Sequence, residues 1–169
     1  MQPLLDNTVR HDSKPRHILQ IPDKINYCLQ LVIQFAKLSG FSPIITTASL
    51  RNTDFLKSLG ATHVIDRNTP ASSFASEIAS ITTSPIPLVF DTIGTSETQQ
   101  LGYDNLAEGG HIVVVVKSSI QETPGSTKKV VGVFGNVQFA TNRAIGRALA
   151  QNLSGFLEAG DIVVRAPSH

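Results

Sequence analysis

The chain has 169 residues, of which 41% are hydrophobic and 16% are charged, and its formal net charge is +1. This composition is typical of a globular domain with a sizeable core, and it gives no electrostatic reason to expect binding to nucleic acid or to an anionic membrane. No apolar run approaches the roughly 20 residues of a membrane span, and the N-terminus has no apolar signal core, so we expect a cytoplasmic protein.

Residues 1–16 are polar and patternless, which predicts an irregular arm, and residues 166–169 are expected to form a tail. Between them, in the segment 17–165, short apolar runs alternate with stretches of helical spacing. The predicted strands are residues 18–21, 43–48, 63–66, 87–91, 111–116, 130–134 and 161–164. The predicted helices are residues 25–39, 53–59, 73–81, 95–106 and 142–159.

Strands that alternate with helices at this pitch indicate βαβ units and a parallel sheet. The strands are nearly continuous apolar runs, as expected when helices cover both faces of the sheet. We therefore predict a single α/β domain with a Rossmann-like, doubly wound, mostly parallel sheet.

Two polar positions are predicted to cap helices. Asn52 precedes the short helix that ends at Gly60, and Ser96 with Gln99 three residues later matches a capping box. The first helix is expected to bury one face that contains Ile25, Cys28, Leu29, Val32, Phe35 and Ala36. The last helix carries an apolar stripe formed by Ile145, Leu149, Leu153, Phe156 and Leu157.

In doubly wound sheets, ligands bind beyond the carboxyl ends of the strands. The second predicted strand is followed by Ser49, Arg51 and Asn52, with no carboxylate before Asp54. Hydroxyl and guanidinium groups at this point accept the 2′-phosphate of NADP, whereas a carboxylate would bind the free 2′-hydroxyl of NAD. A helix cap with a solvated arginine explains the same residues equally well.

The fourth predicted strand ends in Asp91, followed by Thr92 and Ile93. These residues either terminate the strand through backbone hydrogen bonds or lie over a bound cofactor. No nucleophile–base pair or GxSxG elbow is present, so no catalytic residue is assigned. The single cysteine and the five histidines have no metal-ligand spacing, so no metal site is expected either.

Three segments carry a resemblance to a known family. They begin "VIQFAKLSGFSPIITTASLRN", "PLVFDTIGTSETQQLGYDNL" and "KKVVGVFGNVQF", and they lie within residues 28–160. They resemble the cofactor domain of the medium-chain dehydrogenase/reductase superfamily. The similar branch is the zinc-independent quinone oxidoreductase and enoyl reductase group, which includes fungal ToxD-like and trans-acting enoyl reductases.

This resemblance implies an oxidoreductase that transfers a hydride from NADPH to an activated C=C bond. It implies that the segment from Ser49 to Asn52 holds the 2′-phosphate and that Arg67 lies beside the adenine. It places Thr92 and Ile93 toward the nicotinamide. It also implies a catalytic domain of some 150 residues, which is missing from this sequence.

The loop after the first strand departs from the family pattern. Relatives carry glycines at the positions that match Asp23, Lys24 and Leu29, and glycine lets the backbone approach the pyrophosphate. A carboxylate at position 23 would repel the phosphates, although Lys24 could offset that charge. We therefore expect the binding free energy of NADP(H) to be weakened by at least a few kcal/mol, or binding to be lost.

The sequence leaves the function open between two classes. The first is the NADPH-binding half of an enoyl or quinone reductase, with no catalysis expected from the isolated chain. The alternative is a non-catalytic truncated fragment or association module. The expected partners are a small-molecule cofactor and a second copy of the chain, which would pair through the edge strand at residues 130–139.

Overall fold

The structure, a computed structural model, describes residues 17–21 and 26–164. These residues divide into two compact units, which are treated separately below. The larger unit contains the described residues up to Val133 together with Val164, and the smaller unit is Phe134–Val163. Within the described residues, no helix is long and apolar enough to cross a membrane.

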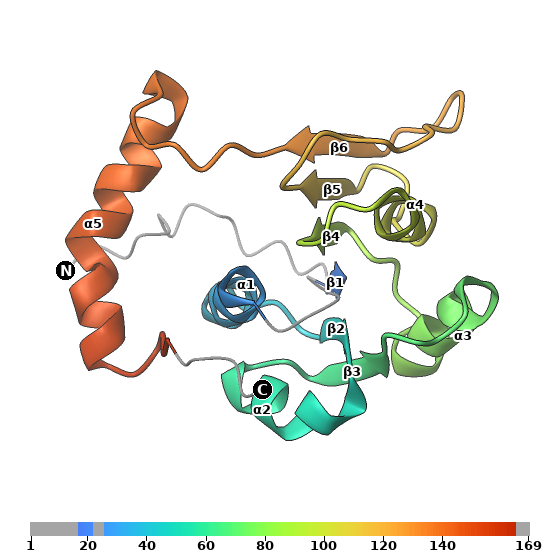
Figure 1. Cartoon of the computed structure of the whole chain (residues 1–169), viewed down its shortest axis with the longest axis horizontal. Coiled ribbons are helices and arrows are strands. Elements are labelled where there is room, and N and C mark those ends of the chain that lie inside the picture. The colour runs from blue at the N-terminus through green and yellow to red at the C-terminus, as the bar shows by residue number, and fades with distance from the viewer. Residues whose placement is uncertain (1–16, 22–25, 165–169) are drawn as a thin grey trace. The chain divides into compact units, whose positions relative to one another are not determined.

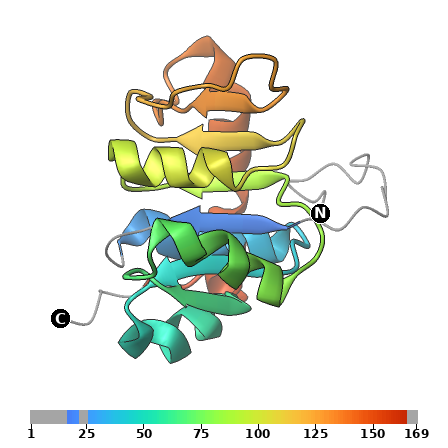
Figure 2. The same ribbon diagram turned by 90° about the vertical axis from the view of Figure 1, so that its right-hand side faces the viewer.

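The larger unit is built on a six-stranded sheet with the order β3-β2-β1-β4-β5-β6 (Figure 1). Its strands are β1 (Ile18–Ile21), β2 (Ile44–Ala48), β3 (His63–Asp66), β4 (Leu88–Asp91), β5 (His111–Val114) and β6 (Lys129–Gly132). All neighbouring strands run parallel (Figure 2). The strand order reverses at the β1–β4 pair, which confirms the Rossmann-like, doubly wound fold.

Helices cover both faces of this sheet. They are α1 (Tyr27–Leu38), α2 (Thr53–Leu59), α3 (Ala71–Ile81) and α4 (Ser96–Asp104). In Figure 1, α1 lies on one face, and α3 and α4 lie on the other. The main apolar core lies on the second face, where Phe74 of α3 and Tyr103 of α4 pack with Leu19, Val89 and Ile112 of the strands.

Helix α4 lies close against the sheet because residue 102 is glycine. A Cβ at Gly102 would lie 2.9 Å from side-chain atoms of Ile112 and Val89 and 3.2 Å from Ile21. A larger residue would require side chains of three strands to shift. The absence of a side chain at Gly102 therefore lets α4 pack closely on the sheet.

The face beneath α1 is more polar than the apolar periodicity predicts. The buried residues of α1 are Leu29, Gln30, Ile33, Gln34 and Ala36, whereas Cys28 is exposed. The predicted inner face was therefore wrong in part, because two glutamines point inward and the cysteine does not. Leu29 is fully buried, so the helix accommodates it as a core residue.

Helix starts differ from two of the predicted caps. Asn52 stands at the N-cap of α2 but makes no side-chain capping bond. Helix α4 is capped by Thr95, whose hydroxyl accepts the Thr98 N–H at 3.3 Å, so the predicted Ser96–Gln99 capping box was wrong. Thr95 precedes Ser96 by one residue and offers the same hydroxyl chemistry, which explains the error.

The smaller unit contains a short 3-10 helix, η2 (Ala140–Asn142), and α5 (Arg143–Glu158). The predicted bounds of the last helix are correct within one residue. Its predicted apolar stripe does not correspond to a buried face, because none of the residues of α5 is buried. The predicted strand at 161–164 was wrong, because these residues form bends and irregular backbone.

Gln20 offers a test of the packing under α1. Leu19 and Ile21 face the main core, so the alternation of a strand turns Gln20 toward α1, beside Thr46 of β2. Gln20 is 0% exposed, and neither amide atom has a partner within the described part of the chain. Gln20→Leu should raise the free energy of unfolding by about 1–3 kcal/mol, because unpaired buried polar groups cost that much.

Denaturant unfolding followed by circular dichroism measures this change. The matched variant is Gln34→Leu, which removes a hydrogen bond from Nε2 of Gln34 to the Gln30 carbonyl oxygen at 2.9 Å. Its free energy of unfolding should rise by less. Equal destabilisation by both substitutions would contradict the interpretation.

Candidate functional site

The carboxyl ends of β1 and β4 meet at the point where the strand order reverses. Ile21, the last residue of β1, lies opposite Asp91, the last residue of β4. The connections leave these two strands toward opposite faces of the sheet, and ligands of doubly wound domains bind at such a point. The loops after β2, β3 and β5 lie along the same edge because all strands are parallel.

Asp91 shapes the turn that follows β4. Its side chain is 0% exposed and accepts hydrogen bonds from the Ile93 N–H at 2.8 Å and the Gly94 N–H at 3.1 Å. The Thr98 hydroxyl donates a further bond at 3.2 Å. Burial raises the pKa of Asp91 above its ordinary value, and these three donors partly oppose the rise. Asp91 therefore stabilises this turn by accepting hydrogen bonds, as expected if it terminates the strand.

Gly94 brings this turn into contact with the end of β5. Its φ is +87°, and a Cβ at this position would collide with the Val116 side chain. Only glycine satisfies both requirements, the left-handed backbone and the close approach. The segment after β4 is thereby packed directly beside the segment after β5.

Thr92 and Ile93, the two predicted nicotinamide-side residues, differ in their surroundings. Ile93 is half-buried and packs against the main core. The Thr92 hydroxyl is buried and has no partner within the described residues. An unpaired buried hydroxyl at the strand-order reversal is a group that a bound ligand could satisfy.

The residues predicted for the adenosine end gather after β2 and β3. Ser49 precedes the short helix η1 (Leu50–Asn52), Asn52 ends it, and neither makes a side-chain capping bond. Arg51 is exposed on that helix. The Arg67 N–H donates to the Ala48 carbonyl oxygen at 3.0 Å, which ties the end of β3 to the end of β2. The structure thus brings these four predicted residues to one end of the sheet edge.

The start of α1 has its own internal cap. The Asn26 side-chain oxygen accepts the Leu29 N–H at 2.7 Å. This donor belongs to the helix N-terminus that binds pyrophosphate in glycine-rich loops. The sequence signal for this cap was available, because asparagine is favoured directly before a helix. Asp23 and Lys24 lie outside the described residues.

Helix α4 holds the long connection between β5 and β6. Gln99 is 0% exposed; its Nε2 donates to the Lys117 carbonyl oxygen at 3.3 Å, and its Oε1 accepts the Ser119 N–H at 2.7 Å. Farther along, the Tyr103 hydroxyl accepts the Thr123 N–H at 3.2 Å. Sequence reasoning missed these contacts, because they join residues about 20 positions apart.

The far end of this connection is held by Glu108, which follows α4. Its carboxylate accepts the Thr127 N–H at 2.7 Å and the Thr127 hydroxyl at 2.8 Å. The bond from the Thr127 backbone is the main cause that holds the pKa of Glu108 below its ordinary value. The connection is therefore fastened at both ends.

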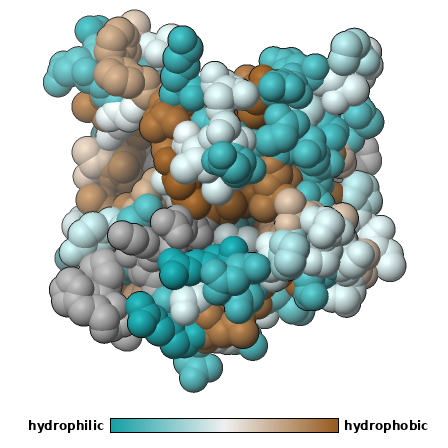
Figure 3. All heavy atoms as spheres, turned by 45° about the vertical axis from the view of Figure 1, so that its right-hand side comes forward, coloured by the Kyte–Doolittle hydropathy of each residue, from teal (hydrophilic) through white to brown (hydrophobic). Residues whose placement is uncertain are grey.

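A separate cavity of about 370 Å³ lies between α3 and α4. Its lining residues are Ala71, Ala75, Glu97, Gln100, Leu101, Asp104 and Asn105. None of the predicted site residues lines it. In Figure 3, hydrophilic side chains predominate on the right of the view. Among the residues that the structure describes, no group of three or more His, Cys, Asp and Glu side chains could hold a metal ion.

The fold and this edge define a Rossmann-type nucleotide-binding domain. Residues 30–150 match the family model described as zinc-binding dehydrogenase, and the chain belongs to this family. It is 34% identical over 106 residues to the trans-enoyl reductase ACTTS2 of Alternaria alternata. This alignment covers 62% of this chain and 29% of that protein. The chain therefore spans less than a third of the length of this curated relative.

Solved structures show the same fold. The nucleotide-binding subdomain of the enoylreductase domain of PpsC from Mycobacterium tuberculosis aligns with a TM-score of 0.64 at 21% identity, over 89% of this chain and 87% of that one. A putative zinc-binding dehydrogenase from Sinorhizobium meliloti, bound to NADP, also aligns with a TM-score of 0.64, at 17% identity over 89% of this chain and 43% of that one. The resemblance to the cofactor domain of medium-chain dehydrogenases/reductases is confirmed.

Gly94→Ala tests the contact between the two segments. We expect it to destabilise the fold by about 1–3 kcal/mol more than Gly125→Ala, because overpacking costs about that much. Gly125 also has a positive φ, +81°, but a Cβ there would meet nothing within 4 Å. The comparison therefore cancels the backbone strain and leaves the collision.

The measurement is denaturant unfolding of both variants. Adding Val116→Ala to Gly94→Ala should recover part of the loss, since the colliding methyl groups are removed. Equal destabilisation in Gly94→Ala and Gly125→Ala would show that the collision is absent in solution.

Proposed function

We propose that this chain is the NADP(H)-binding half of a zinc-independent oxidoreductase that reduces activated C=C bonds in enoyl or quinone substrates. The observation that carries the cofactor choice is the end of β2. Ser49, Arg51 and Asn52 stand there in place of a carboxylate, and neither Ser49 nor Asn52 is used as a helix cap. The trans-enoyl reductases among the relatives support the reaction class.

The residues present fit the cofactor at both ends. Ser49, Arg51 and Asn52 would hold the 2′-phosphate, with Arg67 beside the adenine. The Thr92 hydroxyl, which has no partner in the described part of the chain, would face the nicotinamide side along with Ile93. The bound cofactor would supply the hydride. We assign no catalytic residue to this chain, so its own part is to bind and orient.

The centre of the site fits less well, and we expect weak affinity. Leu29 occupies a glycine position, and Asn26 already accepts one donor of the α1 N-terminus. Fewer backbone donors then remain for the pyrophosphate. Asp23→Gly with Lys24→Gly should strengthen binding, whereas Leu29→Gly would also open a cavity in the core.

Arg51→Ala tests the cofactor choice. A charge-assisted hydrogen bond contributes about 1.5–3 kcal/mol, so NADPH affinity should fall by about 10–100-fold. NADH lacks the 2′-phosphate, and its affinity should not change. Isothermal titration calorimetry measures both cofactors.

The control is Lys57→Ala, which removes one positive charge from the last turn of α2. It should leave both affinities unchanged, because it is not at the end of β2. If the unmodified chain binds no NADPH at millimolar concentration, the cofactor role is wrong for this chain, and a non-catalytic fragment or association module becomes the better interpretation.

We also propose that two copies of the chain pair through the segment 130–139. Strand β6 ends the sheet order, so one edge of its backbone is unpaired within the sheet, and Val131 and Val133 are exposed there. Such edges readily accept another strand. Light scattering should give a dimer, and Val131→Lys should shift it to a monomer. A monomer of the unmodified chain at high concentration would contradict this pairing.

A further inference from the structure

The buried amide of Gln99 contacts the connection after β5 on both sides of Ser118. Its Nε2 donates to the Lys117 carbonyl oxygen, and its Oε1 accepts both the Ser119 N–H and, at 2.9 Å, the Ser119 hydroxyl. One side chain thus satisfies backbone groups of two residues in an irregular segment. Residues 116–119 are all exposed, so this contact ties an exposed segment to α4.

This segment lies beside the candidate site. Gly94 lies against Val116, and Lys117 follows Val116 directly. Two residues before Gly94 is Thr92, whose buried hydroxyl has no partner among the residues described here. The segment that Gln99 holds is therefore next to the turn that we assign to the nicotinamide side.

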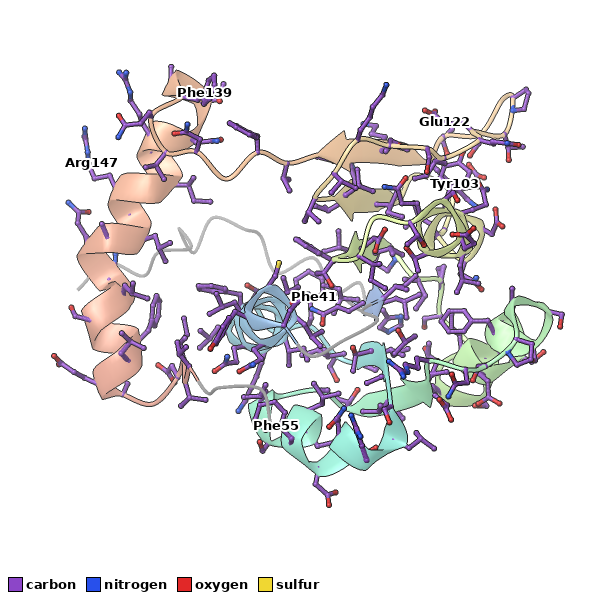
Figure 4. The ribbon with its side chains drawn as sticks, in the orientation of Figure 1. Phe41, Phe55, Tyr103, Glu122, Phe139 and Arg147 are labelled. Carbon is purple, nitrogen blue, oxygen red and sulfur yellow. The ribbon has the colours of Figure 1, made fainter. Side chains whose placement is uncertain are left out.

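The remaining contacts of α4 to the connection lie farther from this edge. Gln100 accepts the Gln121 N–H at 3.0 Å, and Lys128 lies 4.9 Å from the centre of the Tyr103 ring. Figure 4 shows Tyr103 on α4 and Glu122 on the connection, on the same side of the sheet. These contacts fasten the connection without touching the residues directly after β5.

We propose that Gln99 is a positioning residue for the nicotinamide half of the cofactor. It holds Lys117–Ser119 as a preformed wall beside Thr92, so this wall does not have to be ordered when the ligand binds. The inference rests on the proposed NADP(H) function. It gives the buried Gln99 side chain a role other than capping α4.

The test compares two ligands that share the adenosine half. NADPH and 2′-phospho-ADP-ribose, which lacks nicotinamide, are titrated by calorimetry into the unmodified chain and into Gln99→Leu. We expect Gln99→Leu to weaken NADPH binding about tenfold and to leave 2′-phospho-ADP-ribose binding unchanged. The ratio of the two affinities is unaffected by partial unfolding, which lowers both signals together.

Two further variants sharpen the result. Gln100→Leu removes a contact to the same connection away from the site and should leave the ratio as in the unmodified chain. Gln99→Glu keeps the acceptor for Ser119 and should restore part of the ratio. In hydrogen exchange without ligand, the Ser119 N–H should exchange faster in Gln99→Leu than in Gln100→Leu.

The outcomes separate the two proposals. If the unmodified chain binds neither ligand, the NADP(H) function fails, and the role of Gln99 fails with it. If both ligands bind and Gln99→Leu weakens them equally, or weakens neither, the function stands and Gln99 is only a structural contact.

Discussion

The pairing of β1 with both β2 and β4 is the constraint on which the rest of this structure depends. It places the first strand at the centre of a parallel sheet and turns the chain from one winding direction to the other. Parallel strands need crossover connections, which here include helices on both faces, and all carboxyl ends meet at one edge. The candidate site follows from this topology before any side chain is considered.

Close packing then determines what this edge can present. Gly102 lets α4 lie against the strands, and Gly94 lets the turn after β4 contact Val116. Because α4 is held so near, the Gln99 amide reaches backbone groups beyond β5. The buried carboxylate of Asp91 likewise accepts backbone N–H groups of the turn after β4. Its burial raises its pKa.

The space under α1 is filled by side chains of the helix itself. Leu29 and the glutamines Gln30 and Gln34 are all buried there. Asn26 caps the helix internally. Because Asn26 accepts the Leu29 N–H, this backbone donor at the N-terminus of α1 already has a partner within the chain.

The sequence by itself determined the fold class, since strand-length apolar runs such as 63–66 and the helical face of Phe74 and Ile78 depend on local periodicity. It also located the strand ends that carry Ser49, Arg51 and Thr92. Only the tertiary structure decided the contacts of Gln99, the burial of Gln30 and the lack of a partner for Gln20 among the described residues. These features depend on contacts between polar atoms that are far apart in the sequence, and local residue patterns do not predict such contacts.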